Sequence, residues 1–180
     1  MENKLETIVL GGGCFWCTEA IFEQLRGVVS VKSGYAGGKA ANPSYEDVSS
    51  GDTNHAQVIQ IAFDPNQISL TDLLDVFFHT HDPTTLNRQG ADVGSQYRSA
   101  IYTASQAQLE ATKTYIDQLK KTHEFKDEIT TEVRILDQFF EAEDYHQRYY
   151  DNNQTAPYCQ FVISPKLQKL REKFKDKLRT

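Results

Sequence analysis

The segment from Gly11 to Cys17 reads Gly-Gly-Gly-Cys-Phe-Trp-Cys and holds the densest group of chemically useful residues in the sequence. An apolar run precedes the glycines and a helical apolar pattern follows them, which predicts that Cys14 lies in the first turn of a helix. The unpaired N–H groups and the dipole of that helix favour a thiolate, so we expect the pKa of this thiol to lie below its usual value of about 8.5. Phe15 and Trp16 could wall a pocket for a small apolar group such as a methyl. The pattern therefore predicts a nucleophilic cysteine beside an apolar pocket.

The same segment is open to other interpretations. Its glycine spacing is not G-x-G-x-x-G and no P-loop lysine follows, which argues against a phosphate-binding loop. Cys14 and Cys17 could form half of a zinc site, although only Cys159 and a few scattered histidines could complete it. A thioredoxin-like C-x-x-C is the more serious alternative, although Phe15 and Trp16 are bulky for that role. The two rings could also belong to the core.

Other candidate residues lie far from this segment in the sequence. Cys159 follows a polar, loop-like stretch at 151–154; it could reach a distant sulfur from there, or be a small buried hydrophobe. Gln57 begins the apolar face of a predicted strand, so we expect its amide to have a specific partner. Three further polar residues lie in stretches with little periodicity: Tyr45, Asp92 and Tyr97. Their side chains could hydrogen-bond a bound oxygen or serve the structure alone.

The elements that must position these residues alternate between strands and helices. Strands are predicted at 6–10, 28–33, 57–63, 98–103 and 132–136. Helices are predicted between Gly13 and Gly27, from Ser69 with Asp72 as a capping box, from Ser105, over 141–150, and from Ser164. Polar loops are predicted at 34–55 and 79–96. This order predicts an α+β fold, a two-layer sandwich with helices on a mixed, mostly antiparallel sheet, a ferredoxin-like core and a long irregular C-terminal segment.

No repeat or linker divides the chain, so we expect a single domain over residues 1–180. Its core is expected at about 7–165, followed by a basic amphipathic helix at 166–180.

The composition narrows the function classes. The chain has 180 residues, 39% of them hydrophobic, and a net charge of −6. Residues 164–180 hold seven basic residues against Glu172 and Asp176, which leaves the rest of the chain strongly acidic. An acidic body repels phosphate backbones, so we expect no nucleic-acid partner. No run approaches the ~20 apolar residues of a membrane helix, and the first residues lack the apolar region of a secretory signal. We therefore expect a cytoplasmic protein that does not bind membranes. We also expect a monomer, although no sequence feature bears on the oligomeric state.

Separate motifs along the chain resemble one enzyme family. Besides Gly11–Cys17 they are Ser33–Gly38, Asn42–Tyr45, His55–Ala56, Asp82–Thr84, Gln96–Ser99 and Ala142–Gln147. In this order, and over about residues 7–165, the sequence resembles the A-type peptide methionine sulfoxide reductases. The resemblance implies reduction of the S-epimer of methionine sulfoxide, free or in proteins, through a cysteine sulfenic acid and an intramolecular disulfide. It also implies recycling by thioredoxin or another dithiol, without a metal or organic cofactor.

The resemblance also implies roles for the candidate residues. Cys14 matches the nucleophile, and Phe15 with Trp16 matches the aromatic wall that holds the substrate's S-methyl. Cys159 matches a resolving cysteine that condenses with the sulfenic acid. The residues that match those holding the sulfoxide oxygen or the substrate are Tyr45, Asp92 and Tyr97.

Two positions leave questions open. Gln57 stands where the family has a glutamate that donates a proton to the sulfoxide oxygen, and an amide cannot give up that proton. We expect Gln57 to orient the oxygen while the proton comes from Tyr45, Tyr97, Asp92 or a water. Cys17 could pair with Cys14, act as a second resolving cysteine with Cys159, or be structural; a disulfide between Cys14 and Cys159 is the pairing we favour. The alternative functions are a general dithiol–disulfide oxidoreductase using Cys14 and Cys17, a zinc-binding module, or a degenerate non-catalytic member.

Overall fold

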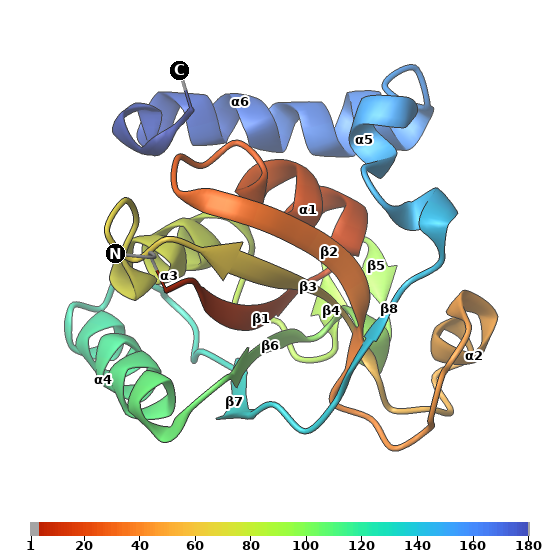
Figure 1. The fold of residues 1–180 in the computed structure, drawn as a ribbon, viewed down its shortest axis with the longest axis horizontal. Helices are drawn as coiled ribbons and strands as arrows, with labels where there is room; N and C mark the ends of the chain where they lie inside the picture. Colours follow the sequence, from red (N-terminus) through yellow and green to blue (C-terminus); the bar gives the residue numbers. More distant parts are fainter. Residues whose placement is uncertain (1–3, 180) are drawn as a thin grey trace.

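The computed structural model describes residues 4–179 and contains a curled six-stranded sheet in the order β7-β6-β1-β3-β2-β8 (Figure 1). The strands are β1 (Glu6–Gly12), β2 (Val28–Ala36), β3 (Ala56–Phe63), β6 (Ser99–Thr103), β7 (Glu132–Ile135) and β8 (Phe139–Glu141). All neighbours pair antiparallel except β6 and β7, which are parallel. The sheet is mixed and mostly antiparallel, as predicted. A separate two-stranded hairpin joins β4 (Arg88–Gln89) to β5 (Asp92–Val93).

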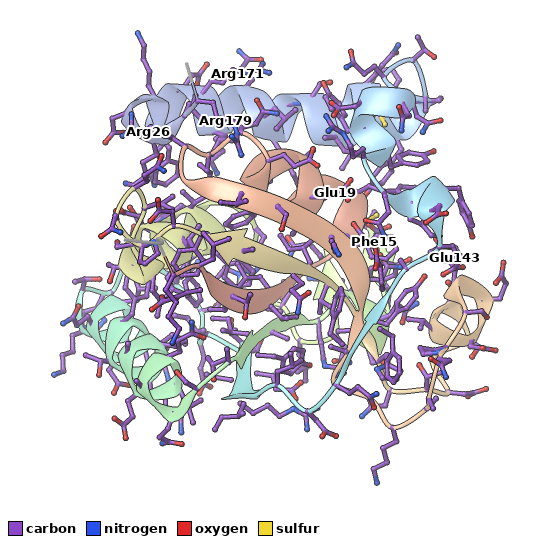
Figure 2. All side chains as sticks on the ribbon, in the orientation of Figure 1. Phe15, Glu19, Arg26, Glu143, Arg171 and Arg179 are labelled. Atoms are coloured by element: carbon purple, nitrogen blue, oxygen red, sulfur yellow. The ribbon has the colours of Figure 1, made fainter. Side chains whose placement is uncertain are left out.

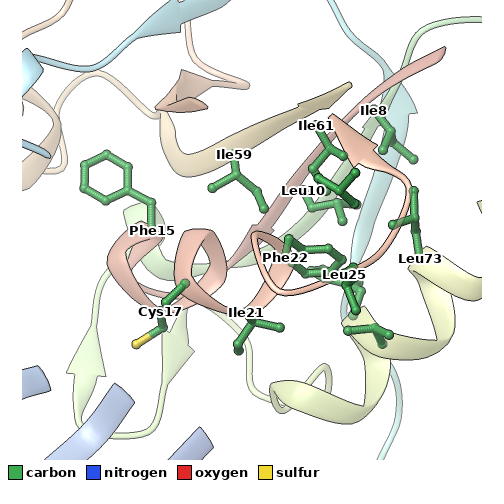
Figure 3. Packing of buried hydrophobic residues seen from close by; sticks show 14 of the residues in the cluster. Ile8, Leu10, Phe15, Cys17, Ile21, Phe22, Leu25, Ile59, Ile61 and Leu73 are labelled. Carbon is green, nitrogen blue, oxygen red and sulfur yellow. The ribbon is translucent and has the colours of Figure 1, made fainter. Parts of the chain in front are cut away.

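The helices pack mainly on one face of this sheet. They are α1 (Phe15–Phe22), α2 (Tyr45–Ser49), α3 (Leu70–Thr80), α4 (Gln106–Lys121), α5 (Tyr149–Asn152) and α6 (Ser164–Lys173). Along β1, Ile8 and Leu10 point into the main core under the helices, whereas Val9 joins a smaller cluster on the other face. This alternation follows from the period of two in a strand. Figure 3 shows Phe22, at the end of α1, packed with Leu10 of β1 and Ile61 of β3.

Local sequence signals locate the helix starts well. The Ser69 side chain accepts a hydrogen bond from the backbone N–H of Asp72, whose carboxylate accepts one from the Ser69 N–H, so the predicted capping box of α3 is confirmed. Ser105 caps α4 as predicted. The same chemistry starts α2 at Ser44, inside the stretch predicted as loop. A pair of residues three positions apart thus carries most of the information for a helix start.

The region 141–150 was predicted as a helix, and that prediction is wrong. Only Glu141, the last residue of β8, is in a strand there, and a 3₁₀ turn at Asp144–His146 and the short helix α5 follow it. The physical reason is tertiary, because β8 pairs with β2 where Gly34 leaves room for the ring of Phe139. A Cβ on Gly34 would lie 2.4 Å from that ring. The predicted loop 79–96 likewise contains the β4–β5 hairpin.

The C-terminal helix is shorter than the predicted 166–180. α6 begins at Ser164, with Pro165 in its first turn, and ends at Lys173. The last described residues turn back onto the end of α1, where the N–H of Arg26 donates to the carbonyl of Lys177 over 2.9 Å. α6 crosses above α1 in Figure 1, so the C-terminal segment covers the helix that carries the cysteine motif. No helix among residues 4–179 has the length and apolar character needed to cross a bilayer.

Candidate active site

Cys14 is the N-cap residue of α1, immediately after β1 and the glycine turn. Gly13 has a φ of +99°, a conformation that favours glycine, and a Cβ there would lie 2.6 Å from the side chain of Gln89. The predicted position at the helix start is therefore correct. Cys14 is only 8% exposed. The tight turn thus brings the sulfur to the end of the sheet and under the C-terminal segment.

The expected lowering of the Cys14 pKa is not found. Burial is the largest effect and raises the pKa of the thiol strongly, and the nearby charge of Cys17 raises it further. The backbone N–H of Trp16 and the hydroxyl of Tyr158 lower this pKa, as helix-terminal donors should, but they are outweighed. Cys14 is therefore a protonated thiol near neutral pH, before substrate binds.

Gln57 of β3 is held by the first residue of α1. The N–H of Phe15 donates to Oε1 of Gln57 over 3.1 Å, and Gln57 is 1% exposed. Because the Phe15 N–H can only donate, this contact fixes which end of the amide is oxygen. The Nε2 group is buried and has no hydrogen-bond partner among residues 4–179. The predicted specific partner is confirmed for the oxygen, and the amide nitrogen remains a donor for a ligand oxygen.

The ring of Phe15 is fully buried and forms the back wall of the site. Its centroid lies 5.7 Å from that of Tyr35, 6.4 Å from that of Tyr45 and 5.1 Å from that of His146. These neighbours come from β2, α2 and the turn before α5, so three distant segments converge on one ring. Such contacts fix the ring rather than merely burying it.

Trp16 forms the second wall and is half-buried. Its indole stacks on the ring of Tyr149, with centroids 3.7 Å apart and planes 8° apart. The indole Nε1–H donates to Nδ1 of His146 over 3.0 Å, and the Tyr158 ring meets the indole edge-on. Burial lowers the pKa of His146, so the ring is neutral and its proton is on Nε2. This Nε2 is buried and finds no partner in the described part of the chain. This wall therefore combines Trp16 of α1 with residues from the segment 146–158, which is far away in the sequence.

Polar side chains approach the cysteine from the hairpin and from α2. The hydroxyl of Tyr158 donates to Asp92 Oδ2 over 3.2 Å and lies 3.4 Å from Cys17 Sγ. The charges of Cys14 and Asp92 both raise the pKa values of Tyr45 and Tyr97, although burial is the largest cause for each. For Tyr97 the pKa reaches about 12. The structure thus brings the predicted Tyr45, Asp92 and Tyr97 together around Cys14, with phenol groups that stay protonated as donors.

The three cysteines are all free and buried. Cys159 is fully buried in the main core, at the start of a π-helical turn over Cys159–Ile163, so in this state it behaves as a small buried hydrophobe. The charge of Cys17 raises the pKa of both Cys14 and Cys159, which puts Cys17 near each of them. Within residues 4–179, no group of three or more His, Cys, Asp or Glu side chains is arranged to hold a metal ion.

Several residues of the site were not predicted as individual site residues. Glu143 accepts hydrogen bonds from the Tyr35 hydroxyl over 3.0 Å and from the Tyr45 N–H over 3.1 Å, and Figure 2 shows it near Phe15. The other residues are His146, Tyr149 and Tyr158. The Ala142–Gln147 motif could have indicated Glu143 and His146 as site residues. A single helix over this stretch, as predicted, would not place them as they are found.

The comparisons with known proteins cover almost the entire chain. Residues 6–178 match the sequence pattern of the family described as peptide methionine sulfoxide reductase. A Deinococcus radiodurans protein named peptide methionine sulfoxide reductase MsrA is 53% identical over 174 residues, 97% of this chain and 84% of that protein. The reduced form of Mxr1 from Saccharomyces cerevisiae is similar with a TM-score of 0.79 and 36% identity, covering 87% of this chain and 90% of that one. Mxr1 in complex with Trx2 is similar with a TM-score of 0.57 and 27% identity, covering 81% and 85%.

Proposed function

This chain belongs to the peptide methionine sulfoxide reductase family, and we propose that Cys14 carries out its reaction, the reduction of methionine S-sulfoxide to methionine. The observation that carries the assignment is the convergence at the start of α1. There a buried thiol, two fixed aromatic rings and an unpaired amide donor meet at the end of one turn. Each of these groups has a counterpart in the substrate: an electrophilic sulfur, a methyl and an oxygen.

The substrate pose follows from these counterparts. The S-methyl lies against Phe15 and Trp16, because burial of a methyl against apolar rings is favourable. The sulfoxide oxygen accepts a hydrogen bond from Gln57 Nε2, which no described residue engages. Tyr45 and Tyr97 supply further hydroxyl donors near Cys14. The oxygen is thus surrounded by neutral donors that strengthen their hydrogen bonds as charge develops on it.

The chemical step transfers one oxygen atom and two electrons. The Cys14 sulfur attacks the sulfoxide sulfur, the S–O bond breaks, and the oxygen moves to Cys14 as a sulfenic acid while methionine leaves. The reaction consumes no net proton, because the thiol proton of Cys14 ends on the sulfenic oxygen. Burial keeps that proton on Cys14 until the substrate binds. We propose that Tyr45 or Tyr97 passes this proton to the sulfoxide oxygen. The tyrosine thereby takes the role of proton donor, which the Gln57 amide cannot fill.

The second half of the cycle uses another cysteine. Condensation of the sulfenic acid with a thiol forms a disulfide and releases water. We propose Cys159 as that thiol, with Cys17 either in reserve or in a second exchange. Because Cys159 is fully buried, the segment that carries it must move before it can meet Cys14. The structure of Mxr1 in complex with Trx2 supports a thioredoxin as the external reductant of this chain as well. Free thiols that cycle in this way fit a reducing compartment, so we propose a cytoplasmic repair role.

A single-turnover experiment tests this proposal. Each epimer of a blocked methionine sulfoxide is mixed with reduced protein without external reductant, and methionine and free thiols are counted. We expect about one methionine per chain from the S-epimer alone, with two thiols lost. Cys14→Ser should form no methionine. No methionine from either epimer, with Cys14 counted as a free thiol after unfolding, would overturn the proposal in favour of a general dithiol–disulfide exchanger. An exchanger would keep its activity after removal of Trp16 and Cys159.

A further inference from the structure

Glu19 is a buried carboxylate on the same helix as Cys14, and the reaction described above does not use it. It lies one turn after Trp16 on α1 and is 1% exposed. Figure 2 shows it on α1, beside the segment that leads to α5. A buried carboxylate is costly unless it is hydrogen-bonded, so its partners indicate what it holds in place.

Each carboxylate oxygen of Glu19 accepts a hydrogen bond from a different element. Oε2 accepts from the Ser33 hydroxyl of β2 over 2.9 Å, and Oε1 accepts from the backbone N–H of Tyr149 over 3.2 Å. Tyr149 is the first residue of α5, and the preceding Arg148 has a φ of +53° and gives no side-chain cap. Glu19 therefore caps α5 from a different helix, in place of the missing local cap.

The same helix also holds the side chain of Tyr149. Its ring stacks on Trp16, three residues before Glu19, and the Trp16 indole in turn donates to His146. Glu19 thus fixes the backbone of Tyr149, and Trp16 fixes its ring. The stacked Tyr149 supports the outer face of the wall that receives the substrate's methyl.

We propose that Glu19 is a positioning residue whose carboxylate pins Tyr149 over Trp16 and so sets the shape of the methyl pocket. Only one part of this proposal rests on the proposed function, namely that the pocket binds the substrate's methyl. Loss of the negative charge replaces a charge-assisted hydrogen bond to Tyr149 with a neutral one about half as strong. The wall then loosens, and the substrate binds less tightly while Cys14 keeps its surroundings.

The ionisation of Glu19 makes this role sensitive to pH. Burial raises its pKa to about 7, and the charge of Glu23 on the same helix raises it as well. The Ser33 hydroxyl on β2 and the N–H groups of Tyr149 and Arg148 lower this pKa. Glu23 itself faces Arg148, Asp151 and Arg179. The carboxylate is therefore present above about pH 7 and is lost below it, which predicts a tighter pocket on the alkaline side.

Trp16 is the only tryptophan in the chain, so its fluorescence reports this wall directly. We expect the emission of the wild-type protein to change with pH around a midpoint near 7, and we expect Glu19→Gln, which keeps the shape but not the charge, to abolish that transition. Ser33→Ala removes a donor that lowers the pKa and should move the midpoint up. Glu23→Gln removes a charge that raises it and should move the midpoint down. Protonation of His146, whose pKa is lowered, is a separate change at lower pH.

Kinetics separate positioning from catalysis. At about pH 8 the Glu19→Gln variant should show a KM for the S-sulfoxide about fivefold above wild type, with kcat within about twofold. At about pH 6 the two proteins should agree, because wild type has then lost the charge too. A wild-type emission that is flat between these pH values, a transition that survives Glu19→Gln, or an unchanged KM would overturn the proposal. A wild-type protein without sulfoxide reduction would instead refute the proposed function, and the emission titration would still test Glu19.

Discussion

Replacing Gln57 with glutamate tests whether the site lacks only a proton donor. One carboxyl oxygen can keep the hydrogen bond from the Phe15 N–H, and the other takes the position of the unpaired Nε2. When protonated, that second oxygen can deliver the proton that an amide cannot. We therefore expect Gln57→Glu to accelerate formation of the sulfenic acid at acidic pH and to lose this advantage as pH rises.

The magnitude follows from the burial of the position. Gln57 is as buried as Glu19, whose pKa is raised by burial from 4.5 to about 7, so a carboxyl at position 57 should also be protonated over much of the neutral range. A positioned general acid is worth about 10²- to 10⁴-fold, and the existing thiol and tyrosine route should reduce the gain to about tenfold near pH 6. The raised pKa also implies that ionisation of the carboxyl lowers the stability of the fold. Ionisation of such a carboxyl lowers the free energy of unfolding by about 4 kcal/mol above about pH 7, and this loss vanishes below the unfolded pKa of about 4.3.

The assay is the rate of methionine release in a single turnover, measured from about pH 5.5 to about pH 8.5 with denaturant unfolding at both ends. Gln60→Glu is the matched control, since it makes the same change on β3 at a half-buried position outside the site. It should leave the rate unchanged. A Gln57→Glu rate equal to or below wild type at about pH 6, with substrate binding intact, would refute the reasoning, as would a gain that increases with pH.

Three other changes test separate parts of the structure. Tyr158→Phe removes a hydroxyl that lowers the pKa of Cys14, so alkylation of Cys14 at fixed pH should slow; an unchanged alkylation rate would mean that this hydroxyl does not act on the sulfur. Cys159→Ser should still release about one methionine per chain but leave a sulfenic acid that dimedone traps. A disulfide formed in that variant at the normal rate would instead assign the resolving role to Cys17. Ser69→Ala breaks the capping box of α3 and should lower the free energy of unfolding by about 1 kcal/mol in urea, without any effect on turnover.

The sequence predicted the parts of the fold that local chemistry decides. The capping box of α3, the Ser105 cap of α4 and the alternation along β3 depend on residues a few positions apart. It also located the reactive segment, because a strand, three glycines and a helix start leave Cys14 at the N-cap whatever packs around it. The resemblance to a family rested on motifs of the same local kind.

Tertiary structure decided what these residues can do. The N-cap position alone predicts a lowered pKa for Cys14, but burial beneath the C-terminal segment outweighs the helix-terminal donors and raises it. The region 141–150 becomes the end of β8, a 3₁₀ turn and the short helix α5 because β8 pairs with β2 at Gly34, a partner more than 100 positions away in sequence. The orientation of the Gln57 amide and the hold of Glu19 on Tyr149 depend on contacts between residues 42 and 130 positions apart. Propensity and periodicity report only on near neighbours, whereas burial and long-range hydrogen bonds exist only once the chain has folded.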